Sequence, residues 1–210
     1  MIKALVVSNG IGGAAYYKSS DEIRYDLVEV TRDFDPDLTP YDLLVVPNGC
    51  DHVAMLKIRD QVRAFLDAGN AVLCCDGWFT NWVPGNRWIH DNSKATKDVR
   101  HFAKTDRHDL LKGVDLTKFD FEPHGMSGWW ACGYIAAAPG ADVLIEDTWQ
   151  RAIVVLDETT TAGAIFLTAS GPLGDFSFYG DADGISQLFK NVLHFLITRK
   201  TASTQELQPA

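Results

Sequence analysis

Short apolar runs of strand length recur along this chain and constrain its fold more than any other feature. They are rich in valine, isoleucine and leucine and lack the strict polar alternation of half-exposed strands. Continuous apolar runs are typical of strands buried on both faces, as in parallel sheets. The runs lie at 2–7, 26–30, 43–46, 71–75, 142–145, 153–156 and 164–168. We therefore expect an α/β protein with a mostly parallel sheet and helices on both faces.

Two helical patterns lie among these runs. Apolar residues from Val53 to Leu66 mark one side of a helix that ends near Gly69, a residue type favoured just past a helix C-terminus. A second pattern of helical spacing covers 185–197. Alternation of strand and helix in the first half predicts parallel pairing with right-handed crossovers. We expect a single domain over 1–200 and a frayed polar tail at 201–210.

Charge and hydropathy exclude several classes of partner. The formal net charge is -9, and nucleic-acid binders need a basic face that neutralises phosphates. No apolar run approaches the ~20 residues that span a bilayer, and the first residues look like a buried strand, not a signal peptide. We therefore expect a cytoplasmic protein with a small-molecule ligand, without nucleic acid or membrane as a partner. A homo-oligomer stays open.

The cysteines and histidines do not form a recognisable metal or disulfide pattern. Four cysteines, at 50, 74, 75 and 132, are too few and too scattered for a disulfide framework and should be thiols in a reducing cytosol. The six histidines show no H-E-x-x-H spacing, so no metal is expected. The glycine-rich segment 9–13 lacks the spacing of a dinucleotide-binding turn, so no cofactor is expected.

Two strand ends carry residues suited to a functional site. Cys75 is followed by Asp76 and Gly77 at the end of one apolar run, and Asn48 and Gly49 follow another. In open α/β sheets, ligands bind at the carboxyl ends of the strands. A nucleophile on a tight strand-to-helix turn needs a small residue after it, and Gly77 meets that need. Backbone amides of Asn48 and Gly49 could donate hydrogen bonds across the cleft.

At these strand ends the chain resembles the class I glutamine amidotransferase-like superfamily. The segment 41–49 is similar to the family's strand that ends in Pro-Gly-Gly, whose amides form an oxyanion hole. The segment 65–77 is similar to its helix, capping glycine and nucleophile elbow, with Cys75 at the nucleophile position. The resemblance implies a three-layer, flavodoxin-like domain in which Asn48, Gly49, Asp76 and Gly77 border the ligand.

Further segments resemble the branch of the superfamily that is similar to ThuA and is linked to trehalose utilisation. They lie at 108–114, 139–144 and 163–196, so that the resemblance covers most of the chain in order. It implies a small polar ligand, for which a carbohydrate-derived molecule is one option.

Departures from the family pattern argue against glutaminase activity. The segment 168–184 contains no histidine for the His-x-Glu of glutaminases, and Leu73 replaces the elbow's first glycine. Asp76 beside Cys75 disfavours a thiolate, because like charges repel. We expect ligand binding without glutaminase activity. The alternatives are a cysteine-dependent amidase or hydrolase with Cys75 as its nucleophile, and a non-catalytic oligomerisation module, so the residues do not decide whether the protein is an enzyme.

A long irregular segment, 78–130, follows the Cys75 strand and is rich in tryptophan, histidine, asparagine and aspartate. Segments of this length in compact domains usually have a function. Tryptophan rings stack on the C–H faces of sugars, and neighbouring side chains that could bind hydroxyls are Asn81, Asn86, Asp91 and Asn92. The alternative is that the tryptophans only pack this segment onto the domain.

The same segment should fold over the carboxyl ends of the strands as a wall or lid. Trp78 is nearest to the turn, and Trp129 lies at the returning end, so both are expected to face the ligand. His124, between a proline and a glycine, is the histidine best suited to act as a base for Cys75.

Overall fold

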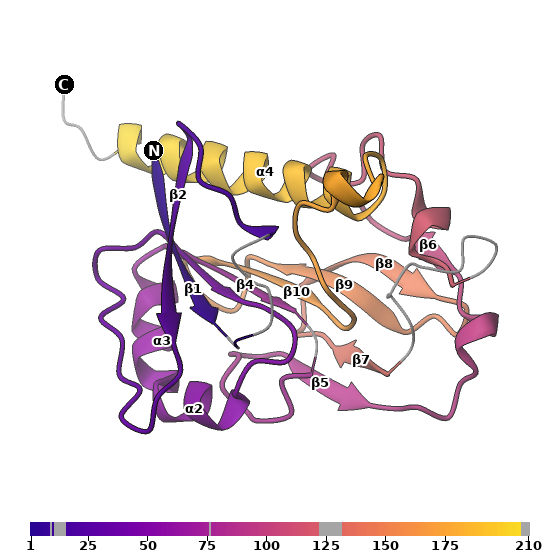
Figure 1. Cartoon of the computed structure of the whole chain (residues 1–210), viewed down its shortest axis with the longest axis horizontal. Coiled ribbons are helices and arrows are strands. Elements are labelled where there is room, and N and C mark those ends of the chain that lie inside the picture. The colour runs from indigo at the N-terminus through magenta and orange to yellow at the C-terminus, as the bar shows by residue number, and fades with distance from the viewer. Residues whose placement is uncertain (9, 11–15, 76, 122–131, 207–210) are drawn as a thin grey trace.

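The computed structural model describes residues 1–8, 10, 16–75, 77–121 and 132–206 of the chain. These residues form a sheet of ten strands with helices on both sides (Figure 1). The strands follow the order β2-β1-β3-β4-β10-β9-β7-β5, and β8 pairs with β9 and with β6. In this part of the chain, no helix is both long and apolar enough to cross a membrane.

One half of the sheet is parallel. Its strands, in spatial order, are β2 (Ile23–Glu29), β1 (Ile2–Ser8), β3 (Leu43–Val46), β4 (Ala71–Cys75) and β10 (Ala164–Thr168). This order is that of the flavodoxin-like folds. The expected α/β class is therefore confirmed, and the apolar runs coincide closely with β1, β3, β4 and β10, whereas β2 begins three residues before the predicted run at 26–30.

The other half of the sheet is antiparallel. Its strands are β9 (Ala152–Asp157), β8 (Asp142–Asp147), β7 (Gly133–Ala136), β5 (Arg87–His90) and β6 (His101–Ala103). The connections 148–151 and 158–163 are too short for a parallel crossover, which needs about a dozen residues, so these strands return as hairpins. The irregular segment predicted at 78–130 supplies β5 and β6 and thus extends the sheet.

The helices flank the sheet on opposite sides, with α4 (Ile185–Glu206) on one side and α2 (His52–Lys57) and α3 (Arg59–Asp67) on the other (Figure 1). The single helix predicted from Val53 to Leu66 is broken at Ile58, which ends α2 and precedes α3. Helix α4 continues into the segment 201–210 that was expected to be frayed. Short 3-10 turns, η1 (Thr96–Asp98), η2 (Leu116–Phe119) and η3 (Ser177–Tyr179), complete the described elements.

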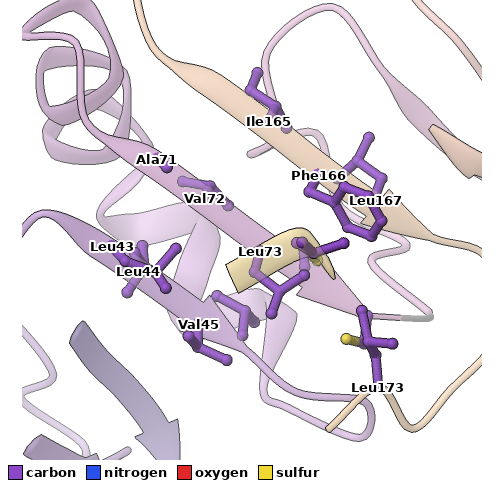
Figure 2. Packing of buried hydrophobic residues seen from close by; sticks show 14 of the residues in the cluster. Leu43, Leu44, Val45, Ala71, Val72, Leu73, Ile165, Phe166, Leu167 and Leu173 are labelled. Carbon is purple, nitrogen blue, oxygen red and sulfur yellow. The ribbon is translucent and has the colours of Figure 1, made fainter. Parts of the chain in front are cut away.

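The core centres on β3, β4 and β10, in which every residue is buried. Figure 2 shows their apolar side chains next to one another, with Leu173 just beyond the end of β10. This arrangement explains why the strands lack polar alternation, since neither face meets water. It also fixes the carboxyl ends of β3, β4 and β10 side by side.

Candidate functional site

The turns after β3 and β4 both contain a glycine in the left-handed region. Gly49 has φ +76° and Gly77 has φ +67°, a conformation that other residues adopt only with strain. A Cβ atom on Gly77 would meet no atom of the described residues within 4 Å, so within this part of the chain the turn borders open space. The register pairs Val46 with Cys74, so the two turns leave the sheet at nearly the same level.

Cys75 lies directly before the Gly77 turn and is fully buried, with an exposed fraction of 0 %. Its surroundings include Cys50, whose thiol donates to the carbonyl of Val7 at 3.4 Å. Burial, with the neighbouring Cys75 and Asp51, raises the pKa of Cys50 to about 12. The Cys50 thiol is therefore neutral, and Cys75 shares this dry environment.

Tyr17 belongs to the same cluster of buried side chains. Burial, followed by the charges of Cys75, Tyr25, Cys50 and Cys74, raises the pKa of Tyr17 well above its usual value. Its ring is 5 % exposed. Cys50 and Tyr17, the described titratable groups of this cluster, are thus a neutral thiol and a neutral phenol, and neither carries a positive charge that would favour a thiolate.

The loops after β1, β3 and β10 pack against one another. A Cβ atom on Gly171 would lie 3.0 Å from the Cβ of Asn48, and one on Gly174 would lie 2.8 Å from that of Tyr16. The half-buried Asn48 thus lies against the loop that follows β10. Asn48 and Gly171 follow β3 and β10, so this contact lies at the carboxyl edge of the sheet, where the sequence predicted the ligand.

Trp78 is 1 % exposed and belongs to the hydrophobic core. Its ring has no exposed face on which a sugar could stack in this conformation. Its indole N–H, however, has no hydrogen-bond partner within the described residues. Buried donors are almost always paired in folded proteins, so Trp78 holds an unused donor next to the open Gly77 turn.

The residues that follow Trp78 cross the carboxyl ends of two strands. The Thr80 hydroxyl donates to the backbone carbonyl of His52, which follows β3, at 2.6 Å. The Trp82 indole donates to Nδ1 of the His52 ring at 3.1 Å. The Trp88 indole donates to the carbonyl of Ala169, just after β10, at 3.1 Å. The indole groups of Trp82 and Trp88 thus fasten this segment to the domain, as the packing alternative predicts.

The suggestion that Asn86 binds a ligand hydroxyl is wrong. Asn86 is 2 % exposed, and its amide donates to Asp157 at 2.8 Å and accepts from the backbone N–H of Ala138 at 2.8 Å. Burial raises the pKa of Asp157, but hydrogen bonds from Thr160, Thr159 and Asn86 outweigh this effect and hold it below its usual value. Asn86 is part of a structural network because a buried carboxylate needs donors.

Two histidine–carboxylate pairs were not visible in the sequence. His101 Nδ1 lies 2.9 Å from Asp120, and His108 Nε2 lies 2.9 Å from Glu158. Glu158 directly follows β9, which runs antiparallel to β10, so this pair lies near the amino ends of the parallel strands. The partners are 19 and 50 residues apart in the chain, so no local sequence motif indicates either pair.

The structure brings five of the predicted site residues to one edge of the sheet: Asn48, Gly49, Cys75, Gly77 and Trp78. The remaining three, Asp76, His124 and Trp129, lie outside the described residues. Whether His124 meets Cys75 therefore stays a prediction.

Comparison with solved structures identifies the fold. The cytoplasmic protein STM1381 of Salmonella typhimurium LT2 superposes with a TM-score of 0.62 and 14 % identity, over 93 % of this chain and 99 % of its own. For the cytoplasmic protein STM3548 of Salmonella typhimurium, the TM-score is 0.57 and the identity 12 %, over 93 % and 98 %. A glutamine amidotransferase of Thermotoga maritima, tm1158, gives a TM-score of 0.52 and 8 % identity, over 99 % and 86 %.

The fold is similar to that of a glutamine amidotransferase. At these identities the likeness concerns the fold alone, because one fold hosts many functions. No protein-family model matches the chain, and no curated protein matches it.

Proposed function

We propose that this protein binds a small polar ligand at the carboxyl edge of its sheet and does not hydrolyse glutamine. We assign it to the ThuA-like branch of the class I glutamine amidotransferase-like superfamily, on the sequence segments that resemble that branch. The observation that carries the proposal is the contrast at the end of β4: Cys75 is 0 % exposed, whereas the Gly77 turn directly after it borders open space.

This contrast favours binding over nucleophilic catalysis. A cysteine nucleophile needs access to its substrate and a group that stabilises the thiolate. Two of the described titratable groups near Cys75, the Cys50 thiol and the Tyr17 phenol, have pKa values that burial raises, so neither stabilises a thiolate. A ligand beside the Gly77 turn would instead meet the backbone of the turns, and it would accept from the unused Trp78 N–H once the buried indole ring turns toward it.

The donors favour a ligand with acceptor oxygens, such as hydroxyl, carbonyl or carboxylate groups. A carbohydrate-derived molecule fits this description, and the resemblance to the ThuA-like branch supports it. A cytoplasmic location is part of the proposal, since both Salmonella proteins of this fold are described as cytoplasmic.

Two tryptophan variants test the proposal. Thermal unfolding is measured with trehalose, glucose and glucuronate as probes, on wild type and on the variants Trp78→Phe and Trp82→Phe. Both variants keep a ring and lose an indole N–H, but only the Trp82 N–H has a described acceptor. We expect at least one probe to raise the Tm of wild type and of Trp82→Phe, and to raise that of Trp78→Phe much less.

Three other outcomes would each contradict one part of the proposal. Equal ligand-induced shifts in both variants would exclude Trp78 as a ligand contact. No shift with any of the three probes would remove the carbohydrate-derived part of the proposal. Ammonia release from L-glutamine by the wild type would contradict the absence of glutaminase activity.

A further inference from the structure

A groove of about 620 Å³ lies between the segment 35–39 and helix α3. Asn70, which also lines it, directly precedes β4, and the segment 35–39 comes shortly before β3. The groove therefore opens at the amino ends of the parallel strands, at the opposite edge of the sheet from the Gly77 turn. Its volume is within the range of about 300–1,000 Å³ that holds small organic ligands.

The base and the helical wall of the groove are largely apolar. Leu38 and Phe65 line it and are each 5 % exposed, so they lie at its base and continue into the core. Ala64, in α3, and Ala68, at the C-terminal cap of α3, line it from exposed positions one helical turn apart. Because alanine side chains are small, they leave room for the apolar body of a ligand.

Two aspartates, Asp35 and Asp37, stand on the opposite wall. The Gln61 amide donates to Oδ1 of Asp35 and so links the two walls. Thr39 donates to Oδ1 of Asp37 from its hydroxyl at 2.7 Å and from its backbone N–H at 2.9 Å. These two hydrogen bonds lower the pKa of Asp37, so its carboxylate is ionised at neutral pH. The Oδ2 atoms of both aspartates accept no hydrogen bond from the described residues.

The charge of these two carboxylates is not balanced within the groove. Among the described residues, no lysine, arginine or histidine lines it. Arg32 is the one cation of the segment 31–40, which carries three aspartates. The cations of α3 and the lysine that contacts Asn70 pair with other carboxylates: Arg59 with Asp60 at 3.3 Å, Arg63 with Asp67 at 2.8 Å and Lys200 with Asp42 at 3.0 Å.

We propose that this groove binds an organic cation, in which an ammonium group is carried by an apolar body of about the size of a phenyl ring. The ammonium lies next to the Oδ2 atoms of Asp35 and Asp37, and the body lies against Leu38, Phe65 and Ala64. The apolar base and the excess of negative charge together select such a ligand over an anion or a fully polar molecule. The site is separate from the one proposed at the carboxyl edge and does not depend on it.

The test uses phenethylammonium as the probe, titrated calorimetrically into the full chain at low salt. 2-Phenylethanol has the same body without the charge and serves as the ligand control. We expect phenethylammonium to bind about three- to tenfold more tightly than the alcohol, because pairing with two exposed carboxylates adds a modest attraction. About 1 M NaCl should remove this preference, since it shortens the Debye length to about 3 Å. Phenylacetate, which carries the opposite charge, should bind more weakly than the alcohol.

The double variant Asp35→Asn/Asp37→Asn tests the charge. Each asparagine keeps the oxygen that accepts from Gln61 or Thr39, so the groove keeps its shape and loses its charge. This variant should bind 2-phenylethanol as wild type does, and phenethylammonium no more tightly than the alcohol. Asp60→Asn removes an exposed carboxylate of α3 that does not line the groove, and it should keep the preference of wild type.

The variant Ala64→Leu tests the position of the ligand. Leucine forms helices nearly as well as alanine, and at this exposed position its side chain takes up space in the groove. It should weaken the binding of both phenethylammonium and 2-phenylethanol about tenfold, the effect of displacing about two buried methylene groups of the ligand.

Any of four results would overturn the site. They are equal affinities of wild type for the amine and the alcohol at low salt, an unchanged preference for the amine in the double asparagine variant, undiminished affinity in Ala64→Leu, and no heat of binding up to about 10 mM phenethylammonium.

Discussion

Both halves of the sheet bury apolar side chains, but the antiparallel half also buries carboxylates. In the parallel half, β3, β4 and β10 are apolar apart from Thr168, and they are buried throughout. In the antiparallel half, the ends of β8 and β9 bury Asp147 and Asp157, which are 1 % and 0 % exposed. Apolar strands depend on contact area, whereas buried carboxylates depend on each donor that satisfies them. The two halves should therefore respond differently to mutation and to pH.

The largest expected effect is in the parallel half. Phe166, on β10, is 0 % exposed, and Phe166→Ala should lower the free energy of unfolding by about 3–5 kcal/mol, measured by urea denaturation. Phe102, on β6 of the other half, is 50 % exposed, and Phe102→Ala should change it by less than about 0.5 kcal/mol. A comparable loss of unfolding free energy in both variants would mean that apolar burial stabilises the two halves equally.

A smaller loss is expected when the antiparallel half loses a carboxylate. Asp147 accepts from the backbone N–H of Trp149 at 2.9 Å and from the Arg151 side chain at 2.7 Å. Asp147→Ala should cost about 3 kcal/mol, because it removes a fully buried carboxylate and leaves Asp91 as the one remaining ion-pair partner of the largely buried Arg151 among the described residues. Asp60→Ala, which removes a carboxylate whose side chain is 93 % exposed, is the control and should leave stability unchanged. A loss below about 1 kcal/mol in Asp147→Ala would contradict the polar description of this half.

The pH dependence of stability sharpens the same comparison. The folded-state pKa of Asp157 lies below its unfolded value, so its stabilising contribution is complete above about pH 4 and is lost as the pH falls through the folded pKa. Asp157→Asn should be less stable than wild type at pH 7, and the difference should shrink below about pH 4. If the difference in unfolding free energy between wild type and Asp157→Asn stayed constant down to pH 2, ionisation of Asp157 would not contribute to stability. Thr168→Val, in the parallel half, is the control, and its effect on stability should not depend on pH.

The sequence predicted the parallel half far better than the antiparallel half. Continuous apolar runs located β3, β4 and β10 to the residue, because burial on both faces leaves a direct signal in composition. The direction of the later strands was not predicted, although their short connections carried that information. The break at Ile58 was also missed, since apolar spacing continues across it.

The site was predicted in part, for a related reason. Gly49 and Gly77 were expected at tight turns, and their positive φ values follow from a local requirement that sequence can express. The roles of Asn86 and Trp82 depend on partners far along the chain: Asn86 bonds to a residue 71 positions away and Trp82 to one 30 positions away. Composition alone could not separate these structural roles from ligand contacts.

The burial of Cys75 at the candidate site is tested most directly by the rate at which iodoacetamide alkylates each cysteine of the native protein near neutral pH. Cys74 and Cys75 are both 0 % exposed and are adjacent, so Cys74 is the internal control, while Cys132 is partly exposed. We predict that Cys132 reacts first and that Cys75 is as protected as Cys74, with peptide mass spectrometry as the readout. Alkylation of Cys75 much faster than that of Cys74 and Cys132 would identify an activated nucleophile and contradict a binding site without cysteine catalysis.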